Sequence, residues 1–514
     1  MGPGFSFLFG RSAPRVAAFF LFALGAFLLL QNLGKGSLYP WDESLSAMRT
    51  QYMFEDGISM TASTYGSPDF NKPPLYYWLA AGSFHLFGPG LFALRLPGVL
   101  FAIGCFVCVY FLTKKVARSA WAACFALACL VLNPHWLNFA RLGMLETAMS
   151  FSLVAAILYG CFGKGRLSPA GGVATALLLS IGAWVKHPFY GALLPFFYCY
   201  WRCCDHAAKP LKPFLWSIGT FLLVGTGWYV LNLVVRGGQF WNFYFEYNVF
   251  KRVVYGIEGH SGWFFSPVRE AFIYAPAAFL CFTASLLALF AAWRKKDGTA
   301  ALAVWLAWLF LILLCCITGK RKMYVVAWFP LGAVCAGFGA AWMARFFRRL
   351  LNEGSQSMPA SRICRLFQDR KRLLWGTGLV CVYALIHTGV VYKVTPDHSP
   401  VESGVYRAVK QHMDAHAFVM TNVIPPAVLF FELGRTANTA AATDGAGTAF
   451  LDAAFARAAS GEPVYLVMEE NENEPNKNRE RFADAAGRVT KVHVDAVSEQ
   501  GLYWAVRLTP VGNP

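Results

Sequence analysis

Long apolar segments separated by short polar connections fill most of the first 394 residues. Each segment is about 20 residues long, the length that a helix needs to cross a hydrocarbon core of roughly 30 Å. The pattern therefore predicts an α-helical polytopic membrane protein with about eleven transmembrane helices. We place these spans near residues 15–32, 92–113, 118–134, 143–162, 170–185, 187–201, 213–235, 270–293, 299–317, 324–344 and 373–393.

The positive charges distinguish the two sides of the membrane. Lys and Arg gather in every second connection, at residues 114–118, 164–166, 202–212 and 294–296, and most densely at 345–372. Because cytoplasmic connections carry an excess of these residues, we place them and the N-terminus in the cytoplasm. The first apolar run lacks a small-residue cleavage site, so we expect it to remain as an uncleaved span. The connections 33–91, 134–142, 236–269 and 318–323 then lie outside.

The hydropathy pattern changes after residue 394. Short apolar runs at 418–423, 464–468, 489–494 and 502–508 alternate with helical stretches near 447–460 and 476–487. Strands that alternate with helices are typical of an α/β fold. We therefore predict two domains, a transmembrane domain of residues 1–394 and a small α/β domain of residues 395–514 on the outside.

Composition supports the membrane assignment and excludes other classes. Only 14% of the residues are charged and 57% are apolar, whereas soluble domains average about 25% charged residues. The net charge of +17 follows the topology, so we expect no nucleic-acid partner. The 14 cysteines lie in apolar segments or cytoplasmic connections, and their spacing indicates neither a disulfide framework nor a zinc site.

The unusual polar residues all fall in the predicted outer loops. The first loop begins with Asp42 and Glu43, at the start of a predicted amphipathic helix over residues 42–57. Leu45, Met48 and Tyr52 share one side of this helix. Asp42 has two interpretations, an N-cap that accepts backbone N–H groups or a catalytic carboxylate.

Two further outer segments combine charge with a position at the membrane surface. Lys72 precedes two prolines and a segment rich in Tyr and Trp. It either contacts lipid headgroups or binds a phosphate as a point charge. In the second loop, Glu146 lies at the entrance of a span, where ionisable groups are unfavourable and usually functional. Pairing with Arg141 across about one helical turn would be a structural alternative.

The last two outer loops are also rich in polar residues. The third loop contains Glu246, Asn248, Arg252 and His260, and the fourth places Lys320 and Arg321 shortly before Tyr324. Cations directly before a span on the outer side break the positive-inside pattern. Such an exception indicates an anionic partner, for which a lipid-borne phosphate is the simplest candidate.

These groups fit glycosyl transfer from a lipid phosphate. A phosphate leaving group has a second pKa near 6, so it departs as an anion and needs no general acid. The reaction needs cations on the departing phosphate and one carboxylate for the glycosyl acceptor. Lys72, Arg252 and Lys320 can supply the cations and Asp42 the carboxylate. One carboxylate acting opposite the leaving group predicts inversion, and this scheme requires neither a divalent metal nor a cofactor.

The order of these motifs resembles the order found in the superfamily of bacterial aminoarabinose transferases and protein O-mannosyltransferases. The resemblance covers roughly residues 15–345 and rests on short motifs in a fixed order, namely Asp42-Glu43, Lys72-Pro73-Pro74, Tyr77-Trp78, Arg95-Leu96-Pro97, Arg141 to Glu146, the third-loop residues, and Lys320-Arg321 followed by Tyr324 and Pro330. It implies the multi-span glycosyltransferase fold of the C type, called GT-C, with helices at the outer membrane surface. It also implies a polyprenyl-phosphate sugar donor, an active site on the outside, and a bacterial inner membrane as the location.

The resemblance assigns roles to particular residues. Asp42 is expected to be the catalytic carboxylate, with Glu146 as the second acid of the site, while Lys72 and Arg252 hold the donor phosphate. We expect the remaining outer-loop groups to line the substrate cavity, namely Glu43, Arg141, His260, Arg321 and Tyr324. The sequence departs from the family where Glu146 replaces the usual Asp, where Lys186-His187-Pro188 replaces Lys-Gly-Pro, and where Asn71 replaces the acid of some members.

Two other functions remain as alternatives. A transporter or flippase of lipid-linked sugars would place its polar groups near the bilayer midplane, often in repeated halves, and this chain shows neither. A non-catalytic subunit of an envelope complex would not need Asp42, Lys72 and Arg252 together. The predicted partners are the lipid-linked donor, membrane lipids, and a glycosyl acceptor that is a lipid such as lipid A, a glycan or a protein.

Overall fold

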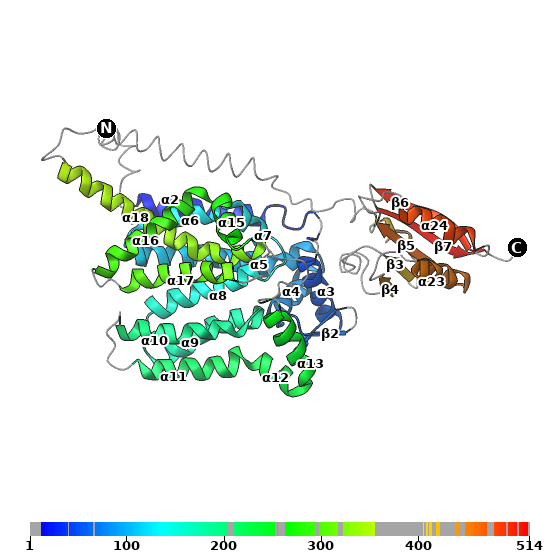
Figure 1. Cartoon of the computed structure of the whole chain (residues 1–514), viewed down its shortest axis with the longest axis horizontal. Helices are drawn as coiled ribbons and strands as arrows, with labels where there is room; N and C mark the ends of the chain where they lie inside the picture. Colours follow the sequence, from blue (N-terminus) through cyan, green and yellow to red (C-terminus); the bar gives the residue numbers. More distant parts are fainter. Residues whose placement is uncertain are drawn as a thin grey trace.

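The structure is a computed structural model of the whole chain. It describes residues 12–36, 38–39, 41–64, 67–203, 210–251, 254, 263–294, 298–316 and 322–354, and in the C-terminal part residues 405, 408–409, 411–413, 418–421, 438–441, 448–469, 477–489, 492–500 and 503–511. The predicted span at 373–393 lies outside these residues. Figure 1 shows a body of long helices beside a separate sheet-containing part.

The first half of the chain forms the centre of the helical body. Its long helices are α2 (Ala13–Leu30), α5 (Leu91–Ala117), α6 (Ala120–Val131), α8 (Glu146–Phe162) and α9 (Pro169–Val185), with the short α7 (Pro134–Ala140) between α6 and α8. Side-chain caps begin three of them, where Ser119, Asn133 and Ser168 accept backbone N–H groups. The structure thus has a helix close to each of the first five predicted spans.

The second half adds helices with more interruptions. The elements are η1 (Pro188–Leu193), α10 (Leu194–Cys203), α11 (Leu211–Thr220), η2 (Phe221–Gly225), α12 (Gly227–Arg236), α13 (Gly238–Phe240), η3 (Trp241–Lys251), α15 (Ser266–Tyr274), α16 (Pro276–Arg294), α17 (Gly298–Cys316), η4 (Lys322–Trp328) and α18 (Phe329–Gly354). Helices α16 and α18 pack closely, since a Cβ added at Gly339 would lie 2.0 Å from the carbonyl oxygen of Cys281.

Three of the described helices are long and apolar enough to cross a membrane, namely Ala13–Leu30, Leu91–Ala117 and Met323–Phe346. Three bent pairs would raise this number to six, and one of them bends by 45° between Leu211–Gly225 and Gly227–Arg236. Shorter apolar helices include Glu146–Phe162 and Pro169–Val185. These helices fit a multi-pass membrane protein, while the figure of about eleven spans remains a prediction.

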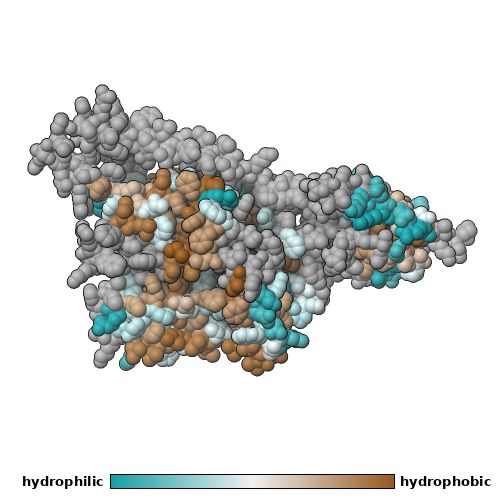
Figure 2. Space-filling model, viewed as in Figure 1, coloured by the Kyte–Doolittle hydropathy of each residue, from teal (hydrophilic) through white to brown (hydrophobic). Residues whose placement is uncertain are grey.

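The surface of the helical body is apolar. Leu223 of η2 and Val234 of α12 are 79% and 78% exposed, and brown apolar side chains cover much of this part of the body in Figure 2. Large apolar patches on a soluble protein would favour association. On a membrane protein they are the surface that contacts lipid.

Short elements cover one end of the helical body. They are α3 (Asp42–Glu55), the antiparallel strands β1 (Ala62–Thr64) and β2 (Ser67–Asp69), and α4 (Leu75–Phe87). We call this the α3–α4 end (Figure 1). Helix α3 confirms a helix at the predicted place, and Met48 and Tyr52 are buried with Leu45 packed against them. Its polar residues from Glu43 to Gln51 are buried as well, so the predicted exposed polar side is absent from this helix. Its first residue is Asp42, so the N-cap position belongs to Trp41.

The C-terminal part contains a five-stranded sheet in the order β4-β3-β5-β7-β6. Its strands are β3 (Phe418–Thr421), β4 (Asn438–Ala441), β5 (Val464–Glu469), β6 (Val492–Gln500) and β7 (Tyr503–Pro510), accompanied by α23 (Thr448–Ala459) and α24 (Lys477–Gly487). Strands β3, β4 and β5 pair in parallel, and β7 pairs antiparallel with β5 and β6. A hydrophobic cluster that includes Ala47 and Tyr77 also includes Val419 and Tyr465 of this sheet, which lies on the side of the α3–α4 end (Figure 1).

Candidate active site

A cavity of about 360 Å³ opens in the helical body, and we call it the central cavity. Its polar lining comes from segments at the helix termini, namely Lys72, Glu146, Lys186, His187, Asn248 and Tyr324. Its apolar lining comes largely from α8, η1, α17 and α18 and includes Leu153, Leu193, Leu309, Leu313, Leu314 and Leu331. Glu146 begins α8 and Leu153 follows about two turns later, roughly 10 Å along the helix. The cavity therefore joins a charged region to an apolar one.

An ion pair lies at the centre of the charged region. The Nζ of Lys186 is 3.0 Å from the Oε1 of Glu146 and 5.3 Å from the centroid of the Tyr324 ring. Burial opposes the charge of the ammonium, but the carboxylates of Glu146 and Asp42 and the phenol of Tyr324 favour it, so the pKa of Lys186 is raised above its ordinary value. Lys186 is therefore a cation at neutral pH, and Asp42 contributes less to this effect than Glu146 and Tyr324 do.

A buried network fixes the segment that carries Lys72. The guanidinium of Arg49 in α3 donates to the Oδ2 of Asp69 at 2.7 and 2.5 Å and to the hydroxyl of Tyr77 at 3.1 Å. The other carboxylate oxygen of Asp69 accepts the backbone N–H of Asn71 at 2.7 Å. Strand β2, helix α3 and helix α4 are thus joined immediately before Lys72. This arrangement directs a partly buried lysine into the central cavity.

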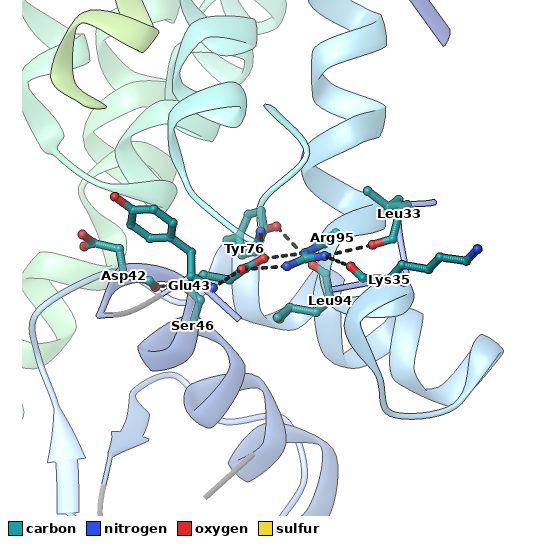
Figure 3. A network of polar contacts seen from close by, with 10 residues as sticks. Leu33, Lys35, Asp42, Glu43, Ser46, Tyr76, Leu94 and Arg95 are labelled. Atoms are coloured by element: carbon teal, nitrogen blue, oxygen red, sulfur yellow. Dashed lines mark hydrogen bonds and ion pairs between the residues drawn. The ribbon is translucent and has the colours of Figure 1, made fainter. Parts of the chain in front are cut away.

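A second buried network holds the start of α3 (Figure 3). The carboxylate of Glu43 forms a bidentate pair with Arg95 of α5, at 2.7 and 3.0 Å. It also accepts the backbone N–H groups of Tyr39 and Gly143, both at 2.7 Å. Arg95 donates further to the carbonyl oxygens of Leu33 and Lys35. Glu43 is fully buried and is not among the residues that line the central cavity, so its contacts are those of a structural residue.

Asp42 points away from this network. Figure 3 shows its carboxylate on the opposite side from the Glu43–Arg95 pair, and it is partly buried. Like Glu43, Asp42 is not among the residues that line the central cavity. Trp41 before it has a φ of 68° and a ψ of −84°, which is a strained backbone for a non-glycine residue. The Trp41 carbonyl accepts from the Ser44 hydroxyl at 3.1 Å and from the N–H of Leu45 at 2.8 Å. The hydrogen bonds and ion pair of Glu43 therefore hold a strained turn in place, and this turn sets the direction of the Asp42 side chain.

The element η3 forms another wall of the central cavity. Its Tyr244 hydroxyl donates to the carbonyl oxygen of Lys186 at 2.8 Å and lies 3.3 Å from the Nδ1 of His187. Asn248, one turn later, lines the cavity and is 5% exposed. Glu246 of the same element forms an exposed pair with Lys251 at 3.0 Å. The third outer loop thus contributes Asn248 to the cavity and leaves Glu246 on the surface.

The structure places the remaining predicted residues as follows. Arg141 is buried, and its guanidinium donates to the carbonyl oxygen of Gln31, which ties the segment before α8 to the end of α2. Four predicted residues lie outside the described part of the chain, namely Arg252, His260, Lys320 and Arg321. Their chain neighbours Asn248 and Tyr324 both line the cavity. The roles predicted for these four residues remain predictions.

Lys186 and His187 line the central cavity, although the sequence pattern led to no predicted role for them. The sequence did contain a sign of their importance, because these two polar residues lie between two apolar runs on the predicted outer side. A cation in such a connection breaks the positive-inside pattern in the same way as Lys320. Among the residues that the structure describes, no group of three or more His, Cys, Asp or Glu is arranged to hold a metal ion.

Part of the chain is similar to a known protein family. Residues 71–228 match the family model of dolichyl-phosphate-mannose-protein mannosyltransferases. An uncharacterized protein of Aquifex aeolicus (strain VF5) is 25% identical over 315 residues, which are 60% of this chain and 60% of that protein. The chain therefore aligns with about three fifths of that relative's length.

Solved structures show the same fold over nearly the whole chain. ArnT from Cupriavidus metallidurans, solved with bound undecaprenyl phosphate, has a TM-score of 0.71 at 16% identity and covers 97% of this chain and 98% of that chain. The archaeal oligosaccharyltransferase AglB from Archaeoglobus fulgidus, solved with an inhibitory peptide and a dolichol-phosphate, has a TM-score of 0.56 at 11% identity, over 95% of this chain and 74% of that chain. These findings confirm the resemblance that the motifs indicated: residues 71–228 match the mannosyltransferase family model, and the chain has the fold of ArnT and AglB.

Proposed function

We propose that this protein transfers a single glycosyl unit from a polyprenyl-phosphate donor to an envelope acceptor at the outer face of the bacterial inner membrane, with inversion. The observation that supports this most strongly is the central cavity, which combines cations with a long apolar wall. A polyprenyl-phosphate sugar has the same two parts, a phosphate and a hydrocarbon chain. The ArnT structure that shares the fold holds undecaprenyl phosphate.

The cations of the cavity favour departure of the phosphate. In the donor the phosphate is a diester with one negative charge, and after transfer it is a monoester with up to two charges, since its second pKa is near 6. Lys72 and Lys186 therefore interact more strongly with the developing product than with the donor. Interactions that strengthen toward the transition state accelerate the reaction. Arg252 and Lys320 would add to this effect, because they follow η3 and precede η4 in the sequence.

Asp42 is the proposed base for the glycosyl acceptor. It lies at the first residue of α3, at the α3–α4 end, and its charge contributes to the raised pKa of Lys186. In this proposal the acceptor approaches Asp42 from outside while the lipid enters from the membrane. Its carboxylate would take the proton of an acceptor hydroxyl as the hydroxyl oxygen attacks the anomeric carbon. The phosphate leaves from the opposite face, which inverts the configuration. An acceptor that is itself an ionised phosphate would only need to be oriented.

Mass spectrometry of the envelope tests the proposal. Glycolipids and glycoproteins would be compared between bacterial cells that produce the protein and cells that carry the empty vector. We expect a mass increment of one sugar only when the protein is present, and the molecule that carries the increment identifies the class of acceptor. Identical profiles from cells that accumulate the protein in the membrane would refute transfer and favour the transport of lipid-linked sugars.

Replacing Lys72 by methionine should weaken use of the lipid donor. Loss of a charge-assisted contact to phosphate removes about 1.5–3 kcal/mol, so kcat/KM should fall roughly 10- to 100-fold. The measurement is the initial rate in nanodiscs at varied donor concentration. The control is Lys251→Met, which removes a half-exposed lysine paired with Glu246 and should change little. Equal rates for the Lys72 variant and the control would remove Lys72 from phosphate binding.

Transfer should continue in the presence of a chelator. The proposed step uses lysine and arginine side chains to stabilise the departing phosphate, so the chemistry has no need of a divalent cation. The initial rate in EDTA is expected to equal the rate in buffer alone, with added Mg²⁺ or Mn²⁺ giving no increase. A rate that disappears in EDTA and returns with one of these ions would show that the phosphate requires a metal.

A further inference from the structure

Asn248 carries a buried hydrogen-bond acceptor that no described residue satisfies. Its side-chain amide N–H donates to the carbonyl oxygen of Phe243 at 3.1 Å. Its Oδ1 is buried and has no partner among the residues that the structure describes. The amide orientation follows from this bond, because the flipped amide would bring two oxygens together. A buried carbonyl oxygen without a partner costs about 1–3 kcal/mol, so its presence in the cavity wall needs an explanation.

The position of Asn248 is fixed by its surroundings. The same η3 element is attached through Tyr244 to the backbone of Lys186, the cation of the proposed phosphate site. Asn248 and Lys186 both line the central cavity. Both residues border the same cavity, so the amide can meet the part of a bound donor that adjoins its phosphate. Less than 1 Å² of the Oδ1 surface is accessible in this structure, so the donor reaches this oxygen by displacing the groups that cover it.

The chemistry of the donor shows which part can satisfy this oxygen. The phosphodiester carries no proton, and the polyprenyl chain has no polar hydrogen, so neither can donate a hydrogen bond. The hydroxyl or N–H groups of the sugar can. We propose that Asn248 is a specificity-determining residue whose Oδ1 accepts a hydrogen bond from one hydroxyl or N–H group of the donor sugar. This inference rests on the proposed function and adds how the sugar is recognised.

A buried hydrogen-bond acceptor of this kind discriminates strongly between donor sugars. A site built to bind a substrate hydroxyl rejects an analogue that lacks it, because the buried group of the protein is then left unpaired. The wild type should therefore disfavour one particular deoxy analogue of its sugar by about tenfold to a hundredfold. Asn248→Leu has a similar volume and no acceptor, so it should lose this discrimination.

The experiment measures transfer by the full-length protein in nanodiscs. A panel of undecaprenyl-phosphate mannose, glucose, galactose and arabinose first identifies a donor that the wild type uses. The wild type and Asn248→Leu are then compared on that donor and on each of its monodeoxy analogues. The intrinsic effect of deoxygenation on reactivity is the same for both proteins, so it cancels in the ratio of their kcat/KM values. For one analogue, we expect kcat/KM in Asn248→Leu to lie within about threefold of the kcat/KM of the parent donor.

Asn232 provides a matched control. It is also a buried amide, whose Nδ2 donates to the carbonyl oxygen of Trp228 at 2.9 Å, but its Oδ1 accepts the hydroxyl of Thr61 at 3.0 Å. Asn232→Leu should therefore leave the ranking of the deoxy analogues unchanged. Binding of undecaprenyl phosphate at pH 8 provides a second control, because this ligand is then a dianion without a proton to donate. Its affinity should be the same in the wild type and in Asn248→Leu.

The outcomes separate the two proposals. If the wild type transfers sugar and shows no deoxy penalty, or if Asn248→Leu slows every donor equally, the role of Asn248 in specificity is refuted. A parallel loss of affinity for undecaprenyl phosphate would likewise indicate a purely structural role. If the wild type transfers sugar from none of the donors, the proposed function itself fails and this inference fails with it.

Discussion

Replacing Asp42 by asparagine is expected to reduce the rate of glycosyl transfer by about 10²–10⁴-fold, the usual contribution of a positioned general base. Asparagine has nearly the same shape but cannot take a proton from the acceptor hydroxyl. The contacts that build the turn come from Glu43, Arg95 and the backbone of Trp41, so they survive the exchange. The initial rate with saturating donor and acceptor in nanodiscs measures the effect.

The loss should be confined to turnover. Asp42→Asn should be produced, purified and thermally unfolded like the wild type, and its affinity for undecaprenyl phosphate should not decrease. The matched control is Asp56→Asn, which changes an exposed aspartate at the other end of the same helix and should keep the wild-type rate. Near-normal turnover by Asp42→Asn would exclude Asp42 as the base.

The largest effect on stability is expected from breaking the Glu43–Arg95 pair. Glu43→Leu would leave the guanidinium of Arg95, which is 2% exposed, without its carboxylate. Removing one partner of a buried ion pair usually costs about 3–5 kcal/mol, because the remaining charge stays buried. The free energy of unfolding in detergent should fall by this amount, and transfer should also fall because the turn before Asp42 loses its support.

Two further variants distinguish this mechanism from a general loss of packing. The double variant Glu43→Leu/Arg95→Met removes both charges, so it should recover much of the stability that the single variant loses. Glu246→Gln removes the carboxylate of an exposed pair with Lys251 and should cost at most about 1 kcal/mol. A double variant as unstable as Glu43→Leu alone would show that the buried charge is not the cause.

Local sequence pattern was sufficient for much of the fold. The period of Leu45, Met48 and Tyr52 predicted α3, which ends at Glu55 shortly before Gly57 with its φ of 92°. Apolar length alone could not show where helices bend. The predicted span at 213–235 is divided into α11, η2 and α12, and the glycines at 225 and 227 that flank the bend were its local signal. The number of spans depends on which helices cross the membrane, and hydropathy indicates this only indirectly.

The candidate site was predictable in composition but not in pairing. Lys72, Glu146 and Tyr324, which line the central cavity, stood out because polar residues are rare beside spans. Their partners could not be read from spacing, since Glu146 contacts Lys186 forty positions away, whereas the sequence suggested nearby Arg141. Glu43 looked like part of the cavity because it follows Asp42. On a helix, adjacent residues point about 100° apart, and here one of them faces Arg95.

The network around Glu43 also has an order in time. Its partner Arg95 follows Glu43 by 52 positions and its partner Gly143 by 100. A ribosome that adds about 5–20 residues per second takes about 5–20 s to reach position 143 after position 43. A nascent chain therefore holds Asp42 in an unfinished loop while α5, α6 and α7 are synthesised. The proposed base reaches its final orientation only when the segment before α8 has been synthesised. This part of the site is therefore assembled from segments made before α5 and after α7.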